Sequence, residues 1–218
     1  MLHDWVYTGY DNVPHALLMT LCEKWHTETS SFHLPVGEMT ITLDGVACLL
    51  HIPIEGQMLS HPKKVSRADG LDLMVRHLGV MQAIAVANCN DEYSAYVSYK
   101  TLRKYYEDYL DAATRLSDAH TQEEVQELRR VRTACVKCYL LYLVGCLFFR
   151  DKSNKRIELI YLTTMEDYAG MRNYSWGGMA LAYLYHCLSR WQSYWGKYYT
   201  AHGNKLSLLT VNIFFFTW

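Results

Sequence analysis

Apolar residues recur at helical spacing, three or four positions apart, along most of the chain. This pattern predicts helices over residues 14–24, 43–51, 71–86, 102–116 and 121–149, and one more after Ser175. Thr121 and Glu124 form a capping box, in which each side chain bonds the backbone amide of the other residue. The helix that they open begins charged and becomes apolar. We therefore expect its first half at the surface and its second half in the core.

Polar and apolar residues alternate only in short stretches. Pro35 and Gly37 break the chain before an alternating run, which predicts a β-hairpin. Thr42 then suits the N-cap of the next helix. A short strand is predicted over residues 157–162, and the side chains expected to face the core near the hairpin are Met39, Ile41, Val46 and Leu50. The predicted fold is mainly α, a single helical domain with a small β-hairpin and one or two short strands.

Composition fits one sizeable folded domain. The chain has 218 residues, of which half are hydrophobic and 20% are charged. A net charge of −1 gives no overall electrostatic reason to bind nucleic acid or a membrane. The apolar run over residues 139–149 is far shorter than the roughly 20 residues that a bilayer span needs, so we interpret it as a buried helix.

The seven cysteines are an odd number and lie in apolar stretches. The first residues show no secretory signal, so we expect an intracellular chain with reduced thiols. Cys135 and Cys138 form a lone CxxC inside a predicted helix. Structural zinc usually needs four ligands, so two half-buried cysteines are the preferred interpretation.

Histidines and carboxylates near the amino end raise two chemical alternatives. A 2-His-carboxylate metal site could draw on His26, His33, His51, Glu28 and Glu38. An acid/base site could instead use His33, Glu38 and Asp44. We prefer hydrogen-bonded structural roles, with His33 and Glu38 orienting backbone, because the spacing matches no known ligand motif.

Two clusters of basic residues and one pair of glycines allow anion binding. The clusters are Lys63, Lys64 and Arg67 in a loop, and Arg129, Arg130, Arg132 and Lys137 on a helix. We interpret the second cluster as a solvated helix face, in which Glu127 can pair with Arg130. The alternative is a surface that follows a phosphate backbone. The glycine pair in "SWGGMAL" is interpreted as close helix packing and not as an anion site.

Two blocks of sequence carry a specific pattern of residues. The first block spans residues 16–59 and contains "FHLPVGEMTITLDG"; the second spans residues 139–190 and contains a D-K-S turn and a Y-S-W-G run. Both blocks closely resemble the plant mobile domain. The motif positions, for which we expect structural roles, are Trp25, Glu28, Phe32, His33, Pro35, Gly37, Glu38, Thr40, Thr42, Leu43, Pro53, Gly56, Asp151, Tyr174, Ser175, Trp176 and Gly177.

Two features depart from the family pattern. Gly45 stands where the family usually has an acidic residue, three positions after the capping Thr42, so this helix start should be weaker by up to about 1 kcal/mol. Residues 196–218 end on an apolar stretch that does not match. We interpret that stretch as a divergent or truncated tail of one domain spanning residues 1–218.

The resemblance implies a nuclear plant protein that acts through protein partners, among them a phosphatase-7-like protein. The family is linked to transposon silencing, genome stability and meristem maintenance. It also carries the description "aminotransferase-like". However, a pyridoxal phosphate enzyme needs a Schiff-base lysine and a phosphate cradle in a larger α/β fold, and we expect neither. We therefore predict a non-catalytic interaction domain without a cofactor. The alternative is a transposon-derived nucleic-acid-binding module that uses Lys63, Lys64, Arg67, Arg129, Arg130 and Arg132.

Overall fold

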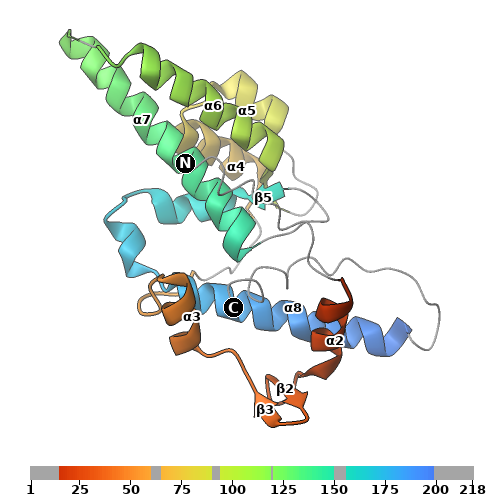
Figure 1. Cartoon of the computed structure of the whole chain (residues 1–218). Coiled ribbons are helices and arrows are strands. Elements are labelled where there is room, and N and C mark those ends of the chain that lie inside the picture. The colour runs from red at the N-terminus through yellow and green to blue at the C-terminus, as the bar shows by residue number, and fades with distance from the viewer. Residues whose placement is uncertain (1–14, 60–64, 90–93, 119, 150–155, 199–218) are drawn as a thin grey trace. The chain divides into compact units, whose positions relative to one another are not determined.

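The computed structural model describes residues 15–59, 65–89, 94–118, 120–149 and 156–198. These residues are mainly helical and include two small antiparallel sheets, which confirms the predicted fold class (Figure 1). The chain packs as two compact units, and each is described by itself. Unit 1 comprises Met1–Ile54 and Gly177–Trp218, and unit 2 comprises Glu55–Trp176.

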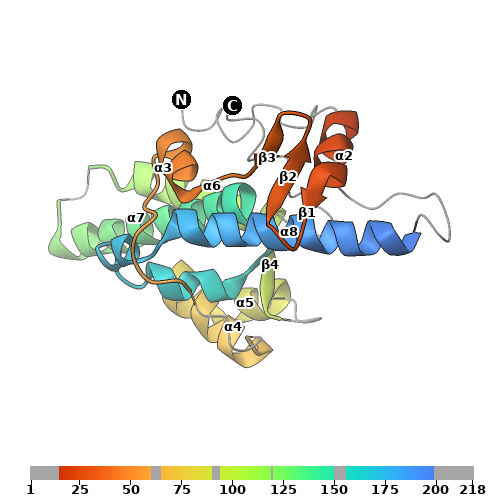
Figure 2. The ribbon, with the colours of Figure 1, turned by 90° about the horizontal axis from the view of Figure 1, so that it is seen from below.

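Unit 1 contains a three-stranded antiparallel sheet. Its elements are helix α2 (His15–Lys24), strands β1 (Trp25–His26), β2 (Ser31–Leu34) and β3 (Gly37–Met39), helix α3 (Leu43–Leu50), and helix α8 (Trp176–Tyr198) from Gly177 onward. Figure 2 shows the strands beside α2. The sheet order is β1-β2-β3, so the predicted hairpin is confirmed as β2–β3, and β1 is a strand that was not predicted.

Trp25 fixes the sheet of unit 1 to α8. Its side chain is fully buried, and its ring centroid lies 4.9 Å from that of Phe32 and 5.0 Å from that of Tyr185. The indole Nε1 donates to Ser189 Oγ at 3.2 Å, and nearby both the amide and the hydroxyl of Thr27 donate to Gln192 Oε1. Burial of a large aromatic ring together with a satisfied N–H makes this contact the anchor of the unit.

Helix α3 begins as predicted. Thr42 is its N-cap, and the Thr42 hydroxyl accepts the amide of Gly45 at 3.1 Å. Val46 faces the core with 1% of its surface exposed. The expectation for Met39 is wrong, because β3 is the edge strand and the Met39 side chain is 54% exposed. Ile41 and Leu50 are half-buried.

Unit 2 begins with three short helical segments in place of the single helix predicted over 71–86. These are α4 (Arg67–Leu73), the π-helical turn η2 (Met74–Leu78) and α5 (Gln82–Asn88). The Ser66 hydroxyl caps α4 by accepting the Asp69 amide at 3.1 Å. Gly79 ends η2 with a φ of +67°, a left-handed conformation that glycine adopts without strain. The predicted helix is therefore wrong at its start and interrupted at Gly79.

Helices α6 (Tyr99–Arg115) and α7 (Gln122–Leu143) run side by side in unit 2 (Figure 1). The predicted capping box is confirmed: the Glu124 amide donates to Thr121 Oγ1 at 3.2 Å, and the Thr121 amide donates to Glu124 Oε2 at 3.0 Å. The opening turns of α7 are mostly exposed, as predicted, but Leu128 and Val131 are buried, so the prediction that the whole first half lies at the surface is wrong. A π-helical turn, η3 (Val144–Phe148), follows the helix.

The strand predicted over 157–162 is much shorter than expected. Strand β5 (Arg156–Glu158) pairs with β4 (Tyr96–Ser98), and the chain then turns into two 3-10 helices, η4 (Leu159–Met165) and η5 (Gly170–Asn173). Leu159, Leu162 and Met165 are each fully buried. Their spacing of three places them on one side of a 3-10 helix, which explains why the apolar run does not continue as a strand.

The two chain ends of unit 2 meet at Gly56. The Gln57 amide donates to the Asn173 carbonyl at 2.6 Å, and the Ser175 amide donates to the Gln57 carbonyl at 2.9 Å. Gly56 has a φ of +113°, and a Cβ at this position would lie 2.3 Å from the Asn173 oxygen. Only glycine therefore allows this close approach of two backbones.

Among the described helices, none combines the length and the apolar character needed to cross a bilayer.

Candidate functional site

The β2–β3 hairpin brings together part of the predicted chemical set. His33 and Glu38 are paired across the two strands, and His33 Nε2 lies 3.1 Å from Glu38 Oε1. The His26 ring stacks on the His33 ring with 3.6 Å between centroids. Ser31 Oγ donates to the second carboxylate oxygen of Glu38 at 3.2 Å. His33 and Glu38 therefore join their side chains across the sheet, and their role in orienting backbone stays a prediction.

Of the five residues predicted for a metal site, the hairpin region brings together two histidines and one carboxylate. His51 lies apart from the hairpin as the C-cap of α3, and Glu28 is exposed between β1 and β2. Among the described residues, no group of three or more His, Cys, Asp or Glu side chains has an arrangement that could hold a metal ion.

The acid/base alternative is not assembled around the hairpin either. The side chains of His33 and Glu38 are 38% and 57% exposed, so the pair lies at the surface. Asp44 is in the first turn of α3, and no contact joins it to either residue among the described parts of unit 1.

Several of the remaining motif positions form hydrogen bonds that connect segments within one unit. In unit 1 the Thr40 hydroxyl donates to the Ser30 carbonyl at 2.6 Å, and the Gly177 amide donates to the Pro53 carbonyl at 2.8 Å. In unit 2 the indole of Trp176 donates to the Met171 carbonyl at 2.9 Å. Phe32 is buried, Leu43 and Pro35 are exposed, Gly37 has a φ of +123°, and Asp151 lies outside the described residues.

Gly177 accounts for the glycine pair. A Cβ on Gly177 would lie 2.8 Å from Ile54 Cγ2 and 3.1 Å from Val46 Cγ1. Its amide is occupied by the Pro53 carbonyl. Close packing within unit 1, and not anion binding, explains this glycine.

The CxxC cysteines lie on the buried side of α7. Cys135 and Cys138 are 8% and 0% exposed. Burial raises the pKa of both thiols, which keeps them protonated and poorly nucleophilic at neutral pH. Their interpretation as packing residues fits this placement.

The described residues of the two basic clusters differ in their surroundings: some are paired, some are exposed and one is buried. The Arg130 guanidinium binds Glu127 through two hydrogen bonds of 2.7 and 2.6 Å, as predicted, and Arg67 donates to the Val86 carbonyl at 3.0 Å. Arg129 and Arg132 are exposed on α7. Lys63 and Lys64 lie outside the described residues. Lys137 is only 8% exposed, so its assignment to a solvated helix face is wrong.

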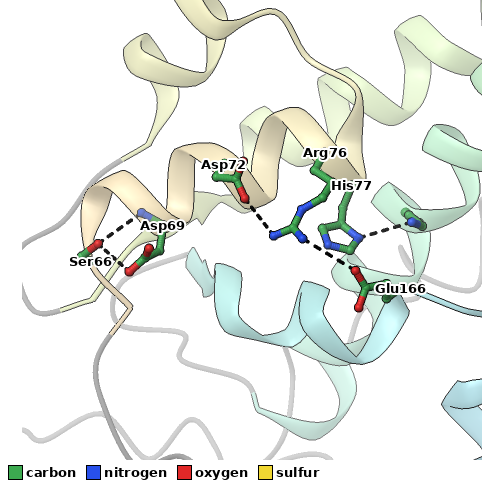
Figure 3. Close-up of polar contacts among 7 residues, drawn as sticks. Ser66, Asp69, Asp72, Arg76, His77 and Glu166 are labelled. Carbon is green, nitrogen blue, oxygen red and sulfur yellow. Dashed lines mark hydrogen bonds and ion pairs between the residues drawn. The ribbon is translucent and has the colours of Figure 1, made fainter.

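Lys137 belongs to a polar cluster that the sequence analysis did not find. Its Nζ lies 3.3 Å from His77 Nδ1, and His77 is 4% exposed. Figure 3 shows Arg76, from the same π-helical turn as His77, between Asp72 and Glu166. The guanidinium lies 2.8 Å from the Asp72 carboxylate and 3.7 Å from the Glu166 carboxylate. We call these five residues the His77 cluster.

The charges in the His77 cluster follow from burial. Burial lowers the pKa of His77 below its ordinary 6.5, and the Lys137 ammonium and the Arg76 guanidinium lower it further. Burial also lowers the pKa of Lys137, which the Glu166 carboxylate partly offsets. Imidazole is therefore the neutral partner, and its Nδ1 lone pair accepts from the lysine.

A signal for this cluster is present in the sequence. The buried positions of α7 include Ala134, Cys138 and Leu141, and Lys137 lies three residues after the first and four before the last. This spacing places the lysine on the apolar side of the helix. His77 carries the same signal, because it follows the buried Leu73 by four residues and the buried Met74 by three.

Comparison with known proteins extends the structural result. The family model for the plant mobile domain matches residues 9–214. Protein MAIN-LIKE 1 of Arabidopsis thaliana is 33% identical over 181 residues, which cover 83% of this chain and 32% of that protein. No solved structure matches this chain.

Two further Arabidopsis thaliana relatives agree. Protein MAINTENANCE OF MERISTEMS is 29% identical over 81% of this chain and 33% of its own length. The serine/threonine-protein phosphatase 7 long form homolog is 28% identical over 84% of this chain and 12% of its own length. This chain thus spans about a third or less of these relatives. Because the family model covers nearly the whole sequence, the chain belongs to the plant mobile domain family, and its relatives include proteins named for meristem maintenance.

Proposed function

We propose that this chain is a non-catalytic protein-interaction module of the nucleus, and that its β2–β3 hairpin contacts the partner. The observation that carries the proposal is the exposure of two apolar residues at the hairpin. Val36 at its turn is 82% exposed and Met39 on its edge strand is 54% exposed. An edge strand presents backbone N–H and C=O groups to which another chain can bond, and exposed apolar side chains beside them add area that the other chain can bury.

The rest of the motif supports a scaffold that presents this hairpin. Trp25 anchors the sheet to α8, and Thr40 closes the hairpin onto the Ser30 carbonyl. His33 and Glu38 brace the two strands from side to side. A rigid support of this kind lowers the conformational entropy that a binding loop loses when its partner docks.

We propose a phosphatase-7-like protein as the partner. The likeness to the phosphatase 7 long form homolog, in which the matched region is only 12% of the length, supports a domain that accompanies such a phosphatase. The family's link to transposon silencing and genome stability is part of the same proposal. In it the chain brings a partner to its site of action and does no chemistry itself.

Direct binding to the purified Arabidopsis phosphatase 7 long form homolog tests the proposal. Met39→Ser should weaken binding at least about tenfold, which corresponds to about 1.4 kcal/mol. Met81→Ser is the matched control, because Met81 is a 69% exposed methionine in unit 2. If both variants bind as well as the original chain, or if no complex forms, the hairpin proposal is wrong.

A separate DNA-binding assay tests the nucleic-acid alternative. Arg129 and Arg132 offer two exposed guanidinium groups on α7. Binding to duplex DNA that falls steeply with salt, and that Arg129→Gln with Arg132→Gln abolishes, would replace the interaction proposal by that alternative. A fluorescent fusion in plant cells tests the nuclear location separately.

A further inference from the structure

The His77 cluster is electrically balanced only while His77 is neutral. Lys137 and Arg76 supply two positive charges, and Asp72 and Glu166 supply two negative charges; these four are the charged groups that act on the imidazole. Two further polar groups lie where η2 ends. The Tyr109 hydroxyl donates to the Leu78 carbonyl at 2.6 Å, and the Arg130 guanidinium, which lies near Gly79, is bound to Glu127. An imidazolium would leave one positive charge uncompensated.

The hydrogen bond between Lys137 Nζ and His77 Nδ1 also holds only one proton between its two nitrogens. Lysine has donors and no acceptor, so the ammonium must donate to the lone pair on His77 Nδ1. A proton added at Nδ1 would turn this acceptor into a donor. Two N–H groups would then face each other across 3.3 Å in a site where both side chains are buried. Burying a second unpaired charge is costly, so the closed contact resists this proton.

The backbone gives a second, independent reason to single out this position. His77 lies in η2, a π-helical turn inserted between α4 and the left-handed Gly79. Such turns are rare, and they are frequent at functional sites. His77 lies on the buried side of this turn, together with Met74 and Leu78, and there it meets Lys137 on the buried side of α7.

We propose that His77 and Lys137 form a one-proton clamp that holds η2 against α7, and that the clamp binds a second proton only by opening. The second proton comes from solvent and binds Nδ1, and the lysine ammonium moves away with its own proton. No covalent bond changes. The inference concerns unit 2 alone and does not depend on the partner proposed above.

The sign of the pH effect follows from linkage. The pKa of His77 in the folded chain lies below its unfolded value, so the unfolded or open state binds the proton more readily. The clamp therefore contributes its full stability above about pH 6.5 and loses it as the pH falls below that value. Because opening takes up one proton, the open fraction can rise by at most about tenfold for each pH unit.

Amide hydrogen exchange of the full chain between pH 7.5 and 5 tests the clamp. After correction for intrinsic exchange, the amides of α7 from Val131 to Leu141 should lose protection by up to about tenfold per pH unit below pH 6.5. His77→Asn should flatten this dependence, because its amide oxygen can accept from Lys137 near the Nδ1 position and does not titrate. His120→Asn is the control: His120 is exposed in the same unit, and this variant should behave like the original chain.

A second measurement follows the imidazole itself. In an NMR titration, the His77 midpoint should move upward in Lys137→Met, because one nearby positive charge is gone. An unchanged midpoint would overturn the proposal. So would a His77→Asn profile identical to that of the original chain. If the variants do not fold, the original chain still decides: protonation of His77 without any rise of exchange in α7 would show that no clamp opens.

Discussion

At the scale of single residues, position in the backbone matters more than chemical type. Lys137 looks like one more basic residue of α7, yet it is buried against His77, whereas Arg130 two turns earlier pairs with Glu127 on the wet side. His33 and Glu38, which look catalytic in the sequence, are a surface pair. Residue type alone therefore does not show which polar side chains are buried, where an unpaired group is costly. Helical spacing supplies part of this information.

Gly56 is the residue for which the structure predicts the sharpest single-site effect. Gly56→Ala should lower the free energy of unfolding by more than the roughly 1–3 kcal/mol that a positive φ costs by itself. The reason is the added Cβ, which would lie 2.3 Å from the Asn173 oxygen. It would push apart the two backbone segments that are hydrogen-bonded there. Urea unfolding measures the change.

Gly37→Ala is the matched control for this prediction. Gly37 has a similar φ of +123°, but a Cβ there would meet nothing within 4 Å. It should therefore show the cost of the backbone strain without a collision. Equal losses in the two variants would mean that the contact with Asn173 does not constrain Gly56.

At the scale of elements, caps and turn residues predict boundaries well where their partners are local. The Thr121–Glu124 box and the Thr42 cap are both where the sequence places them. The Ser66–Asp69 cap carried the same signal and was overlooked. Elements that depend on distant partners were not predictable in this way. Strands β1 and β4 are too short for a pattern and exist because β2 and β5 pair with them.

The π-helical turns mark the limit of periodicity arguments. The buried residues of α4 and η2 are Gly70, Leu73, Met74, His77 and Leu78, so spacings of three and four continue through the turn and do not reveal it. The predicted helix over 71–86 instead begins at Arg67, changes to a π-helical turn at Met74 and stops at Gly79. The hairpin half of the candidate site could be predicted from the sequence. Helical spacing also places Lys137 and His77 on buried sides of their helices, but it could not show that the two side chains meet.

Helix α3 offers a stabilising change at its first turn. Gly45→Glu should raise the free energy of unfolding by about 0.5–1 kcal/mol, because it removes a glycine from the helix and restores the acidic partner of the Thr42 cap. The site has room, since a Cβ there would meet only Thr42 Oγ1 at 3.5 Å. Thermal unfolding measures the gain. Gly45→Ala separates the two contributions, and a larger gain from Ala than from Glu would show that the capping partner is not formed.

At the scale of the whole molecule, the two units differ in how the chain builds them. Unit 2 uses one continuous stretch, Glu55–Trp176, whereas unit 1 needs its opening residues and α8 from the far end of the chain. A unit made from separated segments must close a long loop before its contacts form, and this costs entropy. Unit 2 is therefore the part of the molecule that can fold first.

This difference predicts that unit 2 folds when it is cut out. The bridge between Gln57 and Tyr174 already holds its two ends side by side, so excision of residues 55–176 leaves the ends where they are in the intact chain. The fragment contains Leu102, Leu141 and Leu162, which are all fully buried. It should show helical circular dichroism, cooperative unfolding and dispersed NMR signals.

Residues 15–54 on their own provide the contrast. Their sheet depends on Ser189, Gln192 and Tyr185 of α8, which such a fragment lacks. Trp25 would then lose both its hydrogen bond and one of its ring neighbours. This fragment should remain unfolded, and a synthetic peptide of residues 176–198 should restore the signal of a buried Trp25 in fluorescence. An unfolded 55–176 fragment, or a 15–54 fragment that folds unaided, would show that the two units do not form in the order that their chain connectivity favours.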